Sequence, residues 1–188
     1  MTIWITSDWH FNHNKDFIYT PRGVDNVWDM NEKIIANHNS LVEPNDYVYV
    51  LGDLCLGGGS SENLRQCKKM IENMKGHLKI VLGNHDSAAR VEMFAECWNV
   101  DAILGYADMI KYNKYHFYLS HFPTLTSNLD YDKPLKQRTL NLCGHTHTID
   151  PFLDVDKGYI YHCEVDAHEC YPTNIEFIIQ EFKNKYGQ

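Results

Sequence analysis

The chain has 188 residues, with 17 Lys and Arg against 25 Asp and Glu, and a formal net charge of −8. This length is typical of one domain, so we expect residues 1–188 to form a single domain. The acidic balance disfavours extended binding to nucleic acid, which usually needs a basic face. No run reaches the roughly 20 apolar residues that span a bilayer, and the first residues lack a signal-peptide pattern. We therefore expect a cytoplasmic protein with no membrane partner, while the oligomeric state stays open.

Five short apolar runs along the chain each lead into a polar residue that can bind a metal ion. The runs are rich in β-branched or aromatic residues and end at turn-type residues, which is typical of buried strands. In chain order they are residues 3–5 before Asp8 and His10, 47–51 before Asp53, 78–82 before Asn84, 116–119 before His121, and 140–143 before His145 and His147.

Between the first four of these runs, apolar residues recur at helical spacing. Residues 26–39, 61–74 and about 87–98 are predicted helices, with Asn26 and Ser60 as candidate caps of the first two. In the third, Trp98 is expected on the apolar face. Beyond residue 150, the chain from 159 to 165 and from 175 to 179 is predicted to form strands.

This order of elements predicts an α/β core extended by a second sheet region. In open α/β sheets, ligands bind at the carboxyl ends of the strands. We therefore expect the polar residues at the ends of the five runs to meet at one edge. The six cysteines lack the close pairs of a structural zinc site, and we expect them to be buried free thiols.

Four His, two Asp and one Asn form a mixed nitrogen and oxygen set that suits Mn, Fe, Zn, Co or Ni better than Ca or Mg. Asp8 and His10 lie two positions apart and would point to one side of an extended segment, and His145 and His147 repeat this spacing. Seven ligands are too many for one ordinary site, whereas two divalent ions about 3.5–4 Å apart and sharing Asp53 would use them all. Such a pair binds a phosphoryl group and provides hydroxide at neutral pH.

The order of these motifs resembles the calcineurin-like metallophosphoesterase superfamily. Its pattern of Asp-x-His, Gly-Asp, Gly-Asn-His-Asp, a lone His and Gly-His-x-His appears here from Asp8 to His147. Residues 10–13 and Arg22 are further similar to a small bacterial and phage-type branch. The resemblance implies an αββα sandwich of two mixed β-sheets flanked by helices. It also implies two ligand sets, one of Asp8, His10, Asp53 and His147 and one of Asp53, Asn84, His121 and His145.

Three further residues are candidate catalytic groups. By the resemblance, His85 is the histidine that binds the phosphoryl oxygens and protonates the leaving group. His13 lies three positions after a ligand, where it would contact phosphate, assist proton transfer, or only support the site. Arg22 offers a guanidinium fork that matches phosphate, with a structural salt bridge as the alternative. Protein phosphatases of the superfamily carry Gly-Asp-x-x-Asp-Arg-Gly, and the second Asp is missing after Asp53, which leaves the partner of His85 open.

The predicted function is a metal-dependent hydrolase that cleaves phosphoester bonds through hydroxide held by a dinuclear metal centre. A phosphodiesterase acting on small, nucleotide-like substrates is favoured. The alternatives are a phosphomonoesterase, a single-strand nuclease on the same fold, and a non-catalytic metal-binding scaffold. The loop from 122 to 138 is expected to rim the cleft, and the segment around Val165 and Asp166 is interpreted as structural.

Overall fold

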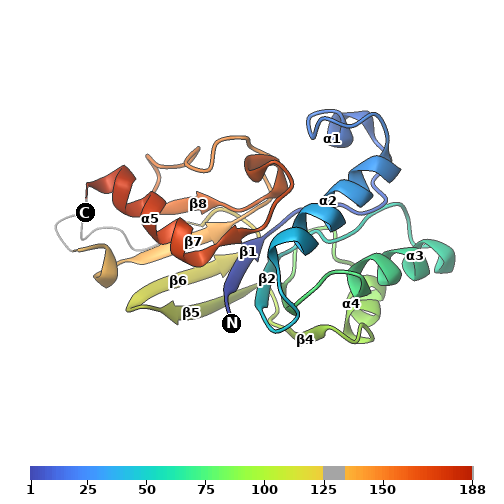
Figure 1. Cartoon of the computed structure of the whole chain (residues 1–188), viewed down its shortest axis with the longest axis horizontal. Helices are drawn as coiled ribbons and strands as arrows, with labels where there is room; N and C mark the ends of the chain where they lie inside the picture. Colours follow the sequence, from blue (N-terminus) through green and yellow to red (C-terminus); the bar gives the residue numbers. More distant parts are fainter. Residues whose placement is uncertain (125–133, 188) are drawn as a thin grey trace.

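The computed structural model describes residues 1–124 and 134–187 and contains two mixed β-sheets with helices packed against them (Figure 1). The first sheet has the strand order β4-β3-β2-β1-β9. Its four neighbouring parallel strands are β1 (Ile3–Thr6), β2 (Tyr47–Leu51), β3 (His77–Val81) and β4 (Val100–Ile103), and β9 (Thr173–Asn174) runs antiparallel to β1. The parallel strands place the carboxyl ends of β1, β2 and β3 side by side.

The second sheet has the order β5-β6-β7-β8 and packs face to face with the first. Its strands are β5 (Ala107–Tyr112), β6 (Tyr115–Ser120), β7 (Thr139–Cys143) and β8 (Ile160–His162). Strand β5 is antiparallel to β6, whereas β6, β7 and β8 are parallel. The predicted sandwich of two mixed sheets is thus confirmed.

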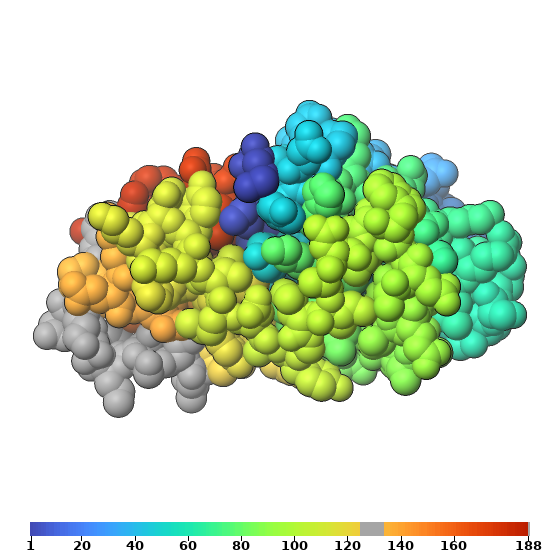
Figure 2. Space-filling view, turned by 90° about the horizontal axis from the view of Figure 1, so that it is seen from below, coloured from blue at the N-terminus to red at the C-terminus, as the bar shows by residue number. Residues whose placement is uncertain are grey.

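The helices lie on two opposite sides of the sandwich (Figure 1). The longer helices are α2 (Val27–Leu41), α3 (Ser61–Glu72), α4 (Ala88–Ala95) and α5 (Ile175–Tyr186), and the short ones are α1 (Asp16–Tyr19) and the 3₁₀ helices η1 (Leu135–Gln137) and η2 (Val165–His168). Helices α2, α3 and α4 pack on the first sheet, and α5 packs into the apolar cluster that includes the second sheet. Seen from below, the chain from α4 to β6 extends across one face of the molecule (Figure 2). This segment passes from the first sheet, through β4, to β5 and β6 of the second.

The alternation of side chains along β2 shows how one strand serves two cores. Val48 and Val50 belong to the cluster formed with α2 and α3. Tyr49 and Leu51 point the other way, into the cluster shared with the second sheet. Successive side chains of a strand point to opposite faces, so a strand buried on both sides is apolar throughout.

The predicted caps agree with the structure, but three predicted elements differ. The Asn26 side chain accepts from two backbone amides of α2, and Ser60 caps α3. Residues 175–179 form the start of α5 and not a strand, because Asn174 caps a helix whose buried residues recur at helical spacing. Strand β8 covers only residues 160–162, and the chain then turns into η2. Helix α4 ends at residue 95, which leaves Trp98 73% exposed.

All six cysteines lie within the described residues and are buried free thiols, as predicted. Among the described residues, none of the helices combines the length and apolar character needed to cross a membrane.

Candidate metal centre

The predicted ligands lie just beyond the carboxyl ends of five strands, β1, β2, β3, β6 and β7. The expectation of an extended chain at the paired ligands is wrong, because Asp8, His10, His145 and His147 all have φ between 50° and 78°. Asp, Asn and His are enriched among the few non-glycine residues that adopt positive φ. In each pair, two ligands with positive φ are separated by one residue. The two pairs therefore share one local backbone geometry, as their matching spacing suggested.

Glycines before the ligands allow the ligand loops to approach one another closely. A Cβ on Gly144 would collide with Ser7 Oγ and with the carboxylate of Asp8, and one on Gly83 would collide with the carboxylate of Asp53. Only a residue without a side chain fits at these two places. The Gly-His and Gly-Asn motifs are therefore needed to bring the ligand loops together.

One group of side chains gathers around Asp8. Its Oδ2 accepts hydrogen bonds from Ser7 Oγ at 2.5 Å and from the backbone amide of His145 at 2.9 Å. The other oxygen, Oδ1, lies 3.6 Å from Nε2 of His10 and 3.7 Å from Nε2 of His147. Both Asp8 Oδ1 and His10 Nε2 are buried without a hydrogen-bond partner in the described part of the chain. Buried polar atoms are rarely left unpaired, so these two fit the role of metal ligands.

Asp53 lies between this group and a second one. Its Oδ2 is 3.5 Å from Nε2 of His10 and also 3.5 Å from Nε2 of His121. Its Oδ1 accepts the backbone N–H of His85 at 2.9 Å, which orients the carboxylate. Burial acts to raise the pKa of Asp53, but the hydrogen bond with His10 and the charge of His121 lower the pKa to about 2. A fully ionised carboxylate therefore faces both groups.

The second group surrounds Nε2 of His121. This atom lies 2.9 Å from Oδ1 of Asn84 and 3.2 Å from Nδ1 of His145. The other nitrogen of His121 lies 2.8 Å from the backbone carbonyl of Leu51, which sets the tautomer and directs Nε2 toward the site. Burial and the charge of His121 lower the pKa of His145, which favours the neutral imidazole that binds metals.

These separations fit the binding of metal cations. Atoms that bind one ion at about 2.0–2.2 Å lie roughly 3–3.6 Å from one another, close to the distances found in both groups. Clusters that can hold an ion are formed by Asp8, His10 and His147 and by Asp8, Asp53 and His121. Burial acts to lower the pKa of His10, but Asp53 and Asp8 raise it, so the surroundings favour a positive charge at this point. The structure brings all seven predicted ligand residues together.

His85 lies on the open side of the two groups. Its Nε2 is 3.9 Å from Asp53 Oδ2, and its side chain is 43% exposed. The ring stands 5.6 Å from that of His10, close to perpendicular. The Arg90 guanidinium donates to the backbone carbonyl of His85 at 2.5 Å and so anchors the loop. The imidazole can therefore reach a molecule bound at this site.

His13 is placed behind His10. The two Nδ1 atoms lie 3.0 Å apart and the rings stack with centroids at 5.2 Å. Burial and the nearby charge of His10 lower the pKa of His13 to about 4, so its imidazole is neutral near pH 7. The geometry fits a residue that orients His10, the supporting alternative named from the sequence.

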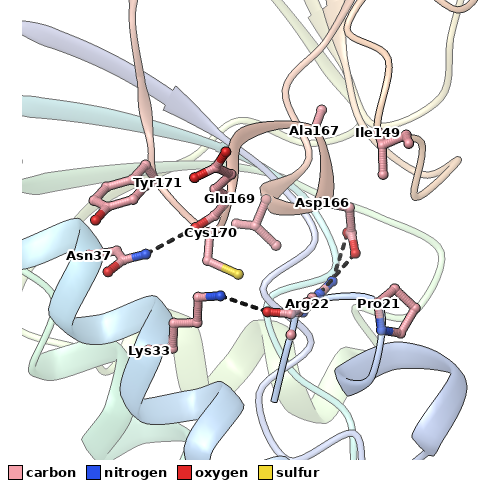
Figure 3. Close-up of a pocket in the computed structure, with 12 residues that line it drawn as sticks. Pro21, Arg22, Lys33, Asn37, Ile149, Asp166, Ala167, Glu169, Cys170 and Tyr171 are labelled. Carbon is pink, nitrogen blue, oxygen red and sulfur yellow. Dashed lines mark hydrogen bonds and ion pairs between the residues drawn. The ribbon is translucent and has the colours of Figure 1, made fainter.

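Arg22 does not face the open side, and this corrects the expectation that it binds phosphate. Its side chain is fully buried, and its nitrogens donate to both oxygens of Asp166 and to the backbone carbonyls of Asp8 and Trp9. Figure 3 shows the guanidinium directed at Asp166, with Lys33 bound to the Arg22 carbonyl. The salt-bridge alternative describes Arg22 correctly.

Asp166 is the residue that the sequence interpretation underrated. Besides Arg22, its carboxylate lies 3.0 Å from Nδ1 of His147. Burial acts to raise the pKa of Asp166, but His147 and Arg22 lower it well below its usual range. A carboxylate behind a metal-binding histidine fixes the ring and its tautomer. The signal in the sequence was an Asp that directly follows the predicted strand at 159–165.

The segment expected to rim the cleft is described only in part. Residues 125–133 lie outside the described residues. At its start, the Phe122 ring lies 4.5 Å from that of His145, and the Thr124 amide donates to Asn141. The first part of this segment therefore does border the candidate site.

Comparison with known proteins agrees with this arrangement. The family model described as calcineurin-like phosphoesterase matches residues 1–179. The uncharacterized protein MJ1445 of Methanocaldococcus jannaschii is 30% identical over 182 residues, which cover 95% of this chain and 89% of that protein. The gene 66 protein of Mycobacterium phage L5 is 25% identical over 162 residues, or 77% of each chain. The crystal structure of AQ665 from Aquifex aeolicus, a protein of unknown function, shares the fold with a TM-score of 0.70, 22% identity and coverage of 96% of this chain and 98% of that one. The chain belongs to the calcineurin-like phosphoesterases, a family of metal-dependent hydrolases of phosphoester bonds.

Proposed function

We propose that this protein is a phosphodiesterase with a dinuclear metal centre. The observation that carries the proposal is the position of Asp53 Oδ2, at 3.5 Å from both His10 Nε2 and His121 Nε2. One carboxylate oxygen thus faces ligand atoms of both groups, as a bridge between two ions requires. A single-ion site would leave one of the two groups without a cation.

The first ion would be held by Asp8, His10, Asp53 and His147, and the other by Asp53, Asn84, His121 and His145. The donor set of imidazole, carboxylate and amide oxygen suits Mn, Fe, Zn, Co or Ni. When bound, such a pair supplies an activated water and neutralises charge on the phosphoryl oxygens. The roles of the protein are to fix the ligands and to present His85 to the substrate.

His85 is the proposed general acid. Its exposed imidazole borders the bridging carboxylate, so it can donate a proton to the oxygen that leaves phosphorus. His13, which contacts His10, and Arg22, which holds Asp166, are proposed to position ligands and not to touch substrate. This division gives one residue for proton transfer and two for support.

A diester is favoured over a monoester on charge. The protein carries a formal charge of −8, so a monoanionic diester meets less repulsion during approach than a dianionic monoester. The side chains of Asn84, His85 and Phe122 are accessible to solvent, so this side of the site is open to a substrate that carries groups on both ester oxygens. A small, nucleotide-like diester meets these conditions.

The test combines metal analysis with a substrate screen. The protein would be loaded with Mn²⁺ or Ni²⁺ and assayed on cyclic nucleotides, dinucleotides, monoesters and short oligonucleotides. We expect two ions per chain and the fastest turnover on small diesters. In Asp53→Asn, we expect the loss of both ions, because the bridging charge is removed.

Other outcomes would select the other functions. Faster turnover of monoesters would identify a phosphomonoesterase, and preference for oligonucleotide ends would identify a single-strand nuclease. Two bound ions without turnover of any ester would indicate a metal-binding scaffold. Retention of two ions by Asp53→Asn would contradict the bridging arrangement itself.

A further inference from the structure

Two exposed phenylalanines lie beside histidine rings of the candidate site. Phe17 is 68% exposed and Phe122 is 47% exposed. Each lies in ring contact with a histidine of the site, one on the side of His10 and the other on the side of His121. Single exposed apolar side chains are common on protein surfaces. These two differ from the others because their rings contact histidine rings of the candidate site, where a bound substrate could stack on them.

Phe17 lies on α1 and is connected to the first ligand group through two rings. Its ring meets His13 edge to face with centroids 5.8 Å apart, and His13 stacks on His10. The next residue, Ile18, is buried in the core and anchors α1. The chain thus holds Phe17 outward at a set place next to the first group.

Phe122 directly follows β6 and the ligand His121. Its ring centroid lies 5.1 Å from that of His121 and 4.5 Å from that of His145. Both of these histidines belong to the second ligand group. Phe17 thus borders the first ligand group through His13, and Phe122 borders the second group directly.

We propose that Phe17 and Phe122 are stacking platforms for nucleobases, so that the preferred substrate is a short phosphodiester that joins two nucleosides. This proposal rests on the proposed phosphodiesterase function and specifies its substrate. Bases stack on aromatic side chains because every base has a π face, and this recognition tolerates different sequences. One platform at each end of the centre would hold the nucleoside on each side of the scissile phosphate.

Charge limits the length of this substrate. A protein that follows a long single strand combines its aromatic platforms with a positively charged groove. This chain has a net charge of −8, and the buried Arg22 beside the centre is occupied by Asp166. We therefore expect recognition of a dinucleotide and no gain in affinity from additional nucleotides.

The test measures binding separately from catalysis. The probes are the phosphonate isostere of AMP, whose phosphorus–carbon bond resists hydrolysis, and the matching isostere of ribose 5-phosphate. Both are titrated by equilibrium dialysis into the Mn²⁺-loaded protein. We expect the base to strengthen binding by roughly 5- to 150-fold, the usual effect of stacking on one aromatic side chain.

Variants assign the effect to the two rings. Phe17→Leu and Phe122→Leu keep an apolar side chain but remove the π face, and each should reduce the advantage of the base-containing probe. Phe17→Tyr and Phe122→Tyr should keep it. Phe177→Leu is the matched control, because Phe177 is 53% exposed on α5 and lines a separate hollow with Trp4 and Pro172.

Several results would overturn the proposal. These are equal affinity for the two probes, loss of the base effect in Phe177→Leu, or an undiminished base effect in the double variant of Phe17 and Phe122. A base effect that vanishes in the Leu variants supports the platforms even if no diester is hydrolysed. Failure of the proposed function and failure of the platforms are thus distinguishable.

Discussion

The carboxylate of Asp166 lies 3.0 Å from Nδ1 of His147, while Nε2 of the same ring lies 3.7 Å from Asp8. His147 is therefore held from behind by an anion that is itself held by Arg22 at 2.9 Å. The second ligand group differs, since His121 is held by a neutral backbone carbonyl. An ion held by His147 would therefore depend on a charge from a distant part of the chain, whereas an ion held by His121 would not.

Asp166→Asn should weaken the binding of this ion by about 10- to 100-fold, the usual effect of removing a carboxylate behind a ligand histidine. Competition with a fluorescent chelator measures the affinity, and circular dichroism checks the fold. Glu169→Gln is the control, because Glu169 is an exposed acid on the same segment. Unchanged affinity in Asp166→Asn would show that Asp166 does not support His147.

His85→Ala should keep both ions and reduce kcat by about 10²- to 10⁴-fold, as expected when a general acid is lost. The side chain contributes no atom to the two ligand groups, and its backbone amide, which binds Asp53, remains. Metal analysis and steady-state kinetics on the best diester are the measurements. Wild-type turnover in this variant would return His85 to a structural role.

Gly144→Ala should destabilise the protein by about 1–3 kcal/mol, the usual cost of overpacking a core site. The new methyl group would collide with Ser7 and Asp8, so the metal affinity should fall as well. Urea unfolding with and without a chelator separates the two effects. Gly59→Ala is the matched control, because a Cβ there meets open space. Equal stability of the two variants would contradict the close approach of these loops.

A pH dependence of stability is expected from His162, which is fully buried between Glu164 and Asp154. Burial acts to lower its pKa, but Glu164 and Asp154 raise it above the usual 6.5. A raised pKa in the folded state stabilises the protein below pH 6.5, and this contribution is lost as the pH rises through the folded pKa. The difference in unfolding free energy between wild type and His162→Gln should therefore be larger at pH 6 than at pH 9.

His38 provides a comparison of opposite sign. Burial lowers the pKa of His38 to about 4, so its neutral form is the stabilising one. The advantage of wild type over His38→Gln should be complete above pH 6.5 and fall as the pH drops toward 4. Urea unfolding of the metal-free wild-type and variant proteins, repeated between pH 4 and pH 9, tests the His38 and the His162 predictions. A pH-independent difference for His162→Gln would show that His162 is not charged in the fold.

Local patterns in the sequence predicted an α/β core with a second sheet region and the seven candidate ligands, and the family resemblance implied the sandwich of two mixed sheets. Short apolar runs ending in Asp, His or Asn mark strands and the ligands at their carboxyl ends, and parallel strands deliver such residues to one edge. The helix caps Asn26 and Ser60 could also be predicted from the sequence, because a cap side chain accepts from a backbone amide no more than three residues away.

Tertiary structure decided what depends on contacts between distant segments. Arg22 and Asp166 are 144 positions apart, and only the packing of η2 against the loop before α2 shows that they form an ion pair and not a phosphate site. The helix at 175–186 displaced a predicted strand because a short apolar run fits either period, and packing of α5 against the second sheet settled the choice. The positive φ angles of Asp8 and His145 likewise arise where two loops converge, which local sequence does not report.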